Sequence, residues 1–420
     1  MDGVDVLLVI AKTVAAFVLW LVSTALLIWG ERRLLAKMQT RIGPNRLGPM
    51  GILQTLADGA KLFFKEDITP RNVDRFVYLS APMASAMVAL LTFAVVPFGG
   101  TFTVAGRPVT LQVWDPDIGL LWVLAMSSLG VYGIVLAGWS SGSKYPLLGG
   151  VRSSAQMISY ELAMGLGLAA VFIYTGSLRS SEIVARQAEP LIGSVPAWNI
   201  IPMAPAFVLF FAAIVAETQR HPFDLPEAEG ELVAGFHTEY TGAKFAMFFL
   251  AEFMNIITMS AVTVTMFLGG PAGPLFGPGW LQALLPTVYF LLKTFVFVFV
   301  FVWLRGTLPR LRYDRLMDLG WKVMLPLGMV WALLTGVSVV LGQTADRSTV
   351  LRYAGIGIAV ALVLYLAAPL FGRRQVEPGG GGGEGLPAGG TGGDQPGGRA
   401  AQPPGEADAP QEPTGEKIEV

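Results

Sequence analysis

Residues 217–240 read ETQRHPFDLPEAEGELVAGFHTEY and form a polar segment between two strongly apolar ones. Acidic side chains stand at six positions: Glu217, Asp224, Glu227, Glu229, Glu231 and Glu239. The two prolines lack amide donors and fix φ, so no long helix runs through HPFDLP, although a short one can begin at Pro226. An irregular acidic loop between membrane spans is costly unless it lines a wet cavity or is covered by a partner. This segment is therefore the first indication of a functional site.

The composition around this segment is that of a membrane protein. The chain has 420 residues, of which 53% are hydrophobic and 14% charged, whereas soluble domains have about 25% charged residues. No segment is a credible strand, and the apolar runs predict an all-α polytopic membrane protein of about nine transmembrane helices. The nine runs that can span a bilayer are 4–30, 76–98, 118–139, 154–174, 200–216, 245–268, 284–304, 323–341 and 350–371.

Charge and cysteine content exclude several classes of function. The net charge is −1, which predicts no nucleic-acid partner. The chain has no cysteine, so it has no disulfide, no thiolate zinc site and no cysteine-ligated iron–sulfur cluster. His221 and His237 can in principle bind a metal, but a proline-rich turn separates them, and we expect no metal site.

The distribution of lysine and arginine predicts the orientation of the spans. With the N-terminus outside, loops on the inside hold roughly four times as many of these residues as loops on the outside. This places the acidic loop and the C-terminal tail in the cytoplasm.

The loop that follows the first span contains a second predicted helix. Residues 51–65 carry apolar side chains at helical spacing and polar ones on the opposite face. The segment is too short to span, so we expect an amphipathic helix in the membrane interface; the alternative is a helix packed on a soluble partner. The apolar positions are Ile52, Leu53, Leu56, Ala60, Phe63 and Phe64.

The chain divides into three predicted parts. Residues 1–341 form an eight-helix membrane core, with functional loops at 31–75 and 217–240. Residues 350–371 form an additional C-terminal transmembrane helix. Residues 374–420 are rich in Gly and Pro and cannot bury a core, so we expect them to be disordered.

Ionisable residues lie inside the apolar runs, where they are costly. Glu161, Glu252 and Lys293 lie within spans, and Glu217 lies at the inner boundary of another. A charge at the bilayer centre costs roughly 2.5–3.5 kcal/mol, so such residues usually exchange protons or pair with each other. Two interpretations remain open: a buried pair between Lys293 and Glu161 or Glu252, or carboxylates that carry protons.

Two long stretches resemble one known family. They are WGERRLLAKMQTRIGPNRLGPMGILQTLADGAKLFFKED from Trp29 and AETQRHPFDLPEAEGELVAGFHTEYTGAKFAMFFLAEF from Ala216. Both are similar to motifs of the quinone-site membrane subunit of proton-pumping NADH–quinone oxidoreductase, respiratory complex I. The resemblance covers roughly residues 4–341, and the additional helix and tail look like a lineage extension.

The resemblance implies roles that the residues alone do not establish. It implies a proton route through Glu161, Glu217 and Glu252, and it leaves Lys293 unassigned. It implies that this chain binds no cofactor, that quinone is the substrate, and that FMN and iron–sulfur clusters lie in partner subunits. The partners implied are the other membrane subunits, the hydrophilic-arm subunits and the lipid bilayer, in the inner (plasma) membrane of the cell. The quinone-chamber residues implied are Glu31, Arg32, Arg33, Arg41, Asp224, Glu227, Glu229 and Glu231.

Two alternative functions belong to other classes. One is the equivalent subunit of a membrane-bound hydrogenase-type complex, against which the two quinone-type motifs argue. The other is a stand-alone ion-coupled transporter, which the internal carboxylates favour and the lack of an inverted repeat disfavours.

Overall fold

The computed structural model describes residues 3–104, 107–192, 195–225 and 232–344. All of them belong to one compact unit, Met1–Leu364. The predicted helix at 350–371 and the tail at 374–420 lie outside the described residues. The helices are α1 Gly3–Met38, α2 Gln54–Phe64, α3 Arg75–Phe93, α4 Gly119–Ser140, α5 Lys144–Thr175, α6 Ser180–Ala188, α7 Ala204–Glu217, α9 Gly242–Phe267, α10 Gly279–Thr307, α11 Tyr313–Asp318 and α12 Leu325–Thr344. Short 3₁₀ turns lie at η1 Pro49–Gly51 and η2 Gly235–His237, and the π-helical turn η3 Leu319–Met324 joins α11 to α12.

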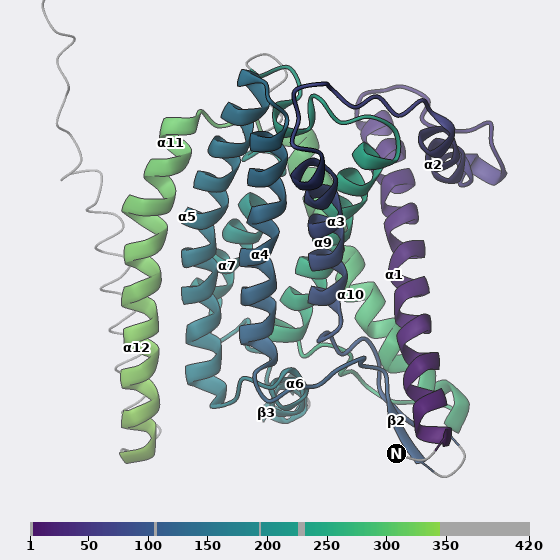
Figure 1. Cartoon of the computed structure of the whole chain (residues 1–420). Helices are drawn as coiled ribbons and strands as arrows, with labels where there is room; N and C mark the ends of the chain where they lie inside the picture. The colour runs from purple at the N-terminus through teal and green to yellow at the C-terminus, as the bar shows by residue number, and fades with distance from the viewer. Residues whose placement is uncertain (1–2, 105–106, 193–194, 226–231, 345–420) are drawn as a thin grey trace, which may run out of the picture. The chain divides into compact units, whose positions relative to one another are not determined.

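The long helices stand side by side and confirm the all-α membrane class (Figure 1). Seven helical segments of the described residues are long and apolar enough to cross a membrane. They are α1, α3, α4, α5, α9, α10 and the continuous run through α11, η3 and α12. The protein is therefore an integral membrane protein.

Helix α7 is shorter than a full span. Its 14 residues extend about 21 Å, less than the ~30 Å of a hydrocarbon core. It compensates by being buried among α5, α9 and α12, with Phe210 and Ile214 fully inaccessible. A Cβ added to Gly167 of α5 would meet the Ala206 carbonyl oxygen at 3.2 Å, so the two helices approach closely there. The polar end of α7 at Glu217 is thereby placed inside the protein.

Two helices begin or end beyond the apolar runs. α1 continues eight residues past Gly30 because ERRLLAKM consists of good helix formers, and the chain then turns at Thr40, where φ is 54°. α5 begins at Lys144 rather than at 154, with Pro146 in its first turn, where proline is tolerated. Hydropathy marks only the apolar part of each helix, so the predicted boundaries missed these polar ends.

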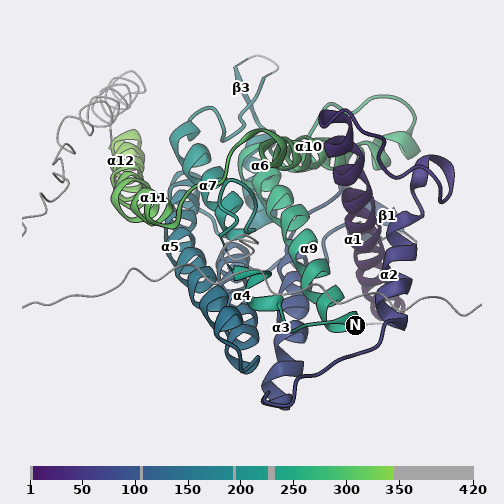
Figure 2. The same ribbon diagram turned by 90° about the horizontal axis from the view of Figure 1, so that it is seen from above.

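The amphipathic helix is confirmed as α2. It lies across the end of the bundle beside the last turns of α1 (Figures 1 and 2). Leu56, Phe63 and Phe64 are exposed on it, as expected for a helix in the membrane interface.

The prediction that the chain contains no strand was wrong. Two antiparallel hairpins occur: β1 Thr101–Val104 with β2 Arg107–Thr110, and β3 Pro190–Ile192 with β4 Val195–Pro196. They lie in the loops at the end opposite α2, together with α6 (Figure 1). Strands of two to four residues are too short to produce a recognisable alternation of apolar and polar residues.

Candidate functional site

A cluster of four charged side chains joins distant parts of the chain. Arg220, in the turn after α7, lies between Glu31 of α1 (Nη1–Oε1 3.3 Å) and Glu252 of α9 (Nε–Oε1 3.0 Å). Arg305 of α10 also pairs with Glu31. The Arg220 guanidinium stacks 4.3 Å from the ring centre of Phe253. Two carboxylates and two guanidiniums balance in charge, which is the condition for burying them near membrane depth.

The turn that carries Arg220 is held in place by α5. The amide nitrogen of Gln156, a fully buried residue, donates to the carbonyl oxygens of Ala216 (2.8 Å) and Phe223 (2.7 Å). The Leu311 amide donates to the Pro222 carbonyl oxygen (3.0 Å) and ties the turn to the segment after α10. These bonds satisfy backbone groups that the prolines prevent from forming a helix.

A cavity of about 490 Å³ opens beside this cluster. Its lining includes charged side chains, among them Glu31, Arg220 and Arg305, together with apolar ones such as Leu35 and Phe253. The other lining residues are Ile28, Arg32, Arg41, Ile42, Gly43, Pro44, Phe249 and Glu252. Such a mixture suits a ligand with a polar head and an apolar tail.

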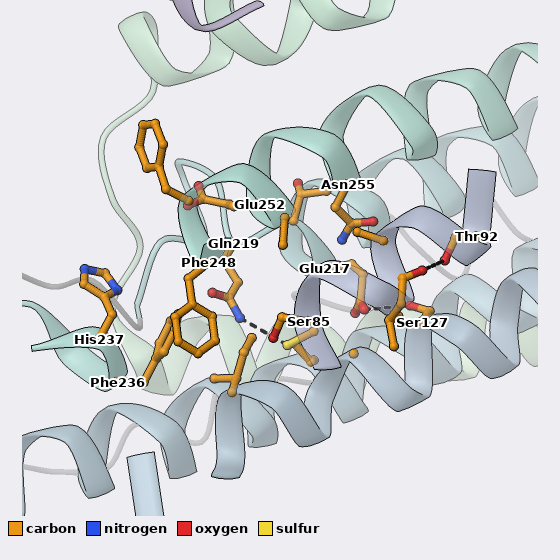
Figure 3. A pocket seen from close by; sticks show the side chains of 18 of the residues that line it. Ser85, Thr92, Ser127, Glu217, Gln219, Phe236, His237, Phe248, Glu252 and Asn255 are labelled. Atoms are coloured by element: carbon orange, nitrogen blue, oxygen red, sulfur yellow. Dashed lines mark hydrogen bonds between the residues drawn. The ribbon is translucent and has the colours of Figure 1, made fainter. Parts of the chain in front are cut away.

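A second, smaller cavity of about 80 Å³ shares Phe249 and Glu252 with the first. Figure 3 shows Glu252 and Asn255 projecting from α9 and Glu217 hydrogen-bonded to Ser127. The same cavity is lined by the aromatic residues Phe236, Phe245 and Phe248, by His237 and by small residues of α3 and α4. Glu252 is thus a wall residue of both cavities.

Two adjacent serines of α4 bind two membrane carboxylates. The Ser127 hydroxyl donates to Glu217 Oε1 at 2.7 Å, and the Ser128 hydroxyl donates to Glu161. Glu217 is 2% exposed and Glu161 is half-buried. Each serine hydroxyl donates one hydrogen bond, so Ser127 and Ser128 hold these two carboxyl groups against α4.

Asp224 lies outside the lining of both cavities. Its Oδ2 accepts from Arg310 at 2.8 Å and lies 3.4 Å from His221 Nδ1. Burial lowers the pKa of His221, although the Asp224 charge acts in the opposite direction. Burial also lowers the pKa of His237 to about 4. The lowered pKa favours the neutral form of each histidine, and Arg310 is the cation that pairs with the Asp224 carboxylate.

Lys293 pairs with neither Glu161 nor Glu252, so that interpretation is wrong. Its Nζ donates to the carbonyl oxygens of Leu268 (2.8 Å), Gly270 (3.0 Å) and Ala272 (2.8 Å), just past the end of α9. It also lies 5.1 Å from the ring centre of Trp198. Lys293 therefore satisfies three loop carbonyls just past the C-terminal end of α9, where a positive charge also interacts favourably with the helix dipole.

The structure brings together only some of the predicted site residues. Glu31, Arg32 and Arg41 line the larger cavity, whereas Arg33 donates to the Met50 carbonyl oxygen and lies over Trp29. Glu227, Glu229 and Glu231 lie outside the described residues.

Arg220, Arg305, Ser127 and Ser128 were not predicted as site residues. Arg305 directly follows an apolar run, and the two serines interrupt an apolar helix. An arginine at the end of a span usually reaches the membrane interface and serine is common in packed transmembrane helices, so neither position indicates a site by itself.

Comparison with known proteins identifies the family. A family model described as NADH dehydrogenase matches residues 11–336. The chain is 50% identical over 377 residues to the H subunit of NADH-quinone oxidoreductase from Frankia casuarinae, covering 88% of this chain and 81% of the relative. The chain belongs to this family. The corresponding protein of Frankia alni shows the same identity and coverage.

The residues matched by the NADH dehydrogenase family model include the two motifs and the charged cluster. Both motifs lie inside the matched residues, as do all four residues of the cluster. The family resemblance inferred from the motifs is therefore confirmed.

Proposed function

We propose that this chain is the membrane subunit of a proton-translocating NADH–quinone oxidoreductase and forms the membrane part of its quinone-binding chamber. The observation that carries this proposal is the 490 Å³ cavity, whose lining combines the charged cluster with apolar side chains. The two Frankia relatives are named as parts of such an oxidoreductase. Electrons come from FMN and iron–sulfur clusters of partner subunits in the hydrophilic arm.

Reduction of a quinone takes up protons, so the chamber needs groups that supply them. We propose that Glu252, Glu217 and Glu161 begin a proton route that leads away from the chamber. Glu252 lines both cavities, and Glu217 lines the smaller one. The consecutive residues Ser127 and Ser128 of α4 donate hydrogen bonds to Glu217 and Glu161. Arg220 holds Glu252 at the start of this series.

The remaining chamber residues follow from the same family membership. We propose that Arg32, Arg33 and Arg41 lie near the entrance, and that Asp224, Glu227, Glu229 and Glu231 belong to the loop that faces the hydrophilic arm. In this proposal Asp224 acts through its pairing with Arg310 rather than by contact with the quinone.

A substitution that fills the larger cavity tests whether it is the quinone-binding chamber. Leu35→Trp adds bulk at the cavity wall, so quinone reduction should fall by at least about tenfold, because the quinone no longer reaches its position. NADH oxidation with ferricyanide should be unchanged, because it needs only the hydrophilic arm. The control is Leu26→Trp on the exposed face of α1, which should leave both activities intact. Normal quinone reduction in an assembled Leu35→Trp complex would refute the chamber.

Cysteine labelling tests the orientation. The chain has no cysteine, so single introduced cysteines report without background from this subunit. With the N-terminus outside, Arg312→Cys should react only with a reagent in the cytoplasm, and Arg107→Cys only with a reagent outside. The reverse pattern would contradict the orientation and place the acidic loop on the wrong side for the hydrophilic arm.

A further inference from the structure

Helix α2 connects the two walls of the larger cavity. One wall is α1, which contributes Ile28, Glu31 and Leu35, and the other is α9, which contributes Phe249 and Phe253. The N-terminal half of α2 is attached to α1. The Thr55 hydroxyl donates to the Ala25 carbonyl oxygen (3.1 Å), and Asp58 pairs with Arg32.

The C-terminal end of α2 has no comparable contact with α1 among the described residues. Its apolar side chains Phe63 and Phe64 are 74% and 91% exposed, and burial in lipid holds a helix at a depth but not at a lateral position. The position of this end therefore depends on its packing against α9 and on the segment that follows α2.

That segment is attached to the start of α9 by a polar clamp, which consists of Asp67, Ile68, Thr69, Thr241 and Lys244. Lys244 Nζ lies 2.8 Å from Asp67 Oδ1 and donates to Thr69 Oγ1 at 2.8 Å. The Thr241 hydroxyl accepts from the Ile68 amide (3.1 Å) and donates to the Ile68 carbonyl oxygen (3.3 Å). Thr241 is the N-cap residue of α9, but its side chain makes no capping bond there. The hydroxyl serves the clamp instead of the helix end.

The start of α9, which carries Thr241 and Lys244 of the clamp, is held by contacts with α3. The rings of Tyr78 and Tyr240 stack at 4.1 Å with an 8° interplanar angle, and both are buried. The Tyr78 hydroxyl donates to the Glu239 carbonyl oxygen, and the Tyr240 hydroxyl donates to the Tyr78 carbonyl oxygen. Lys244 Nζ lies 4.9 Å from the Tyr78 ring centre. The start of α9 is thereby fixed to α3.

Close backbone packing adds to the clamp. Gly242 has φ +58°, and a Cβ built on it would lie 3.5 Å from the Leu62 carbonyl oxygen and 3.6 Å from that of Lys65. The last turn of α2 thus packs directly on the first residue of α9.

We propose that Asp67 and Lys244 are positioning residues for quinone binding. The clamp fixes the C-terminal end of α2 to α9, and α2 then sets the distance between α1 and α9 at the larger cavity. This inference rests on the proposed function, since it assigns the width of that cavity to the binding of the quinone tail. Neither residue lines the cavity, so both act through α2.

Lys244→Met tests the proposal in the assembled complex. The KM for a quinone with a long isoprenoid tail should rise roughly fivefold, which corresponds to one hydrogen bond of typical net strength. The kcat should stay within about twofold, because the charge cluster and the carboxylates are untouched. NADH oxidation with ferricyanide should not change. Asp67→Asn, which leaves Lys244 in place, should also raise the KM for this quinone, but by less than Lys244→Met.

The position of α2 is measured separately. Spin labels at Phe63→Cys on α2 and Tyr145→Cys at the start of α5 report their mutual distance, and both native side chains are exposed. The distance distribution should be narrow in the otherwise native chain and broad in Lys244→Met. The matched control is Lys322→Met, which removes an exposed pair with Asp318 and should change neither the distance nor KM.

A covalent replacement of the clamp should restore function. A disulfide formed by Ile68→Cys and Thr241→Cys in the Lys244→Met chain should return KM to the native value, and its reduction should raise KM again. A narrow distance distribution in Lys244→Met would overturn the clamp, and a broad one with unchanged KM would overturn its role in quinone binding. Failure of the chamber itself would be recognised independently, by normal quinone reduction in Leu35→Trp.

Discussion

Arg220→Met should remove most of the assembled complex from the membrane. Arg220 lies 3.0 Å from Glu252 and 3.3 Å from Glu31, and all three side chains are largely buried. Removal of one partner from a buried ion pair costs about 3–5 kcal/mol, because the other charge stays buried without compensation. Such a loss is comparable with the total stability of a typical domain. The measurement is the amount of intact complex on a native gel at equal expression.

A second substitution in the Arg220→Met chain identifies which carboxylate is left without a partner. Glu31 keeps Arg305 as a partner, whereas Glu252 loses its 3.0 Å contact. Glu252→Gln should therefore recover part of the assembled complex, and Glu31→Gln should not, because it would deprive Arg305 of its partner as well. Equal recovery by both would contradict the pairing described above. The control is Arg312→Met, which removes an exposed pair with Asp314 and should leave assembly intact.

Glu161→Gln should give an assembled complex that pumps protons poorly. Glutamine can still accept the hydrogen bond from Ser128, but it cannot ionise. If Glu161 belongs to the proton route, coupled turnover and proton translocation should fall by at least about tenfold, since removal of a positioned proton-transfer group costs roughly 10²–10⁴-fold. The measurement is proton uptake into vesicles during NADH oxidation with quinone.

Because Lys293 does not pair with Glu161, a loss of pumping in Glu161→Gln cannot result from a broken ion pair with Lys293. Lys293 is held by three carbonyl oxygens past the end of α9, so Glu161→Gln leaves no buried ammonium without a partner. The effects of Glu161→Gln and Lys293→Met should accordingly add rather than compensate. The control Glu189→Gln, at an exposed position after α6, should pump normally. Normal pumping by an assembled Glu161→Gln complex would exclude Glu161 from the route.

The class of fold and the family could be predicted from local features of the chain. Apolar runs of about 20 residues have the length of a transmembrane α-helix, which satisfies its own backbone groups in lipid. Eight of the nine predicted runs correspond to helices of the described residues. The helical spacing of Leu56, Phe63 and their neighbours was enough to predict α2. These features depend on local composition and periodicity, which can be read along the chain.

The pairs that the charged side chains form could not be predicted in this way, because they depend on how the helices pack. Arg220 and Glu31 are 189 positions apart, and Arg305 and Glu31 are 274 apart, so no local pattern connects them. A pair between Lys293 and Glu161 or Glu252 was one of two interpretations that the sequence left open, yet the Lys293 ammonium binds the carbonyls past the end of α9 instead. The clamp between Asp67 and Lys244 likewise depends on how α2 packs against α9. A charge in a membrane takes whichever partner helix packing brings within reach, and packing is a property of the whole fold.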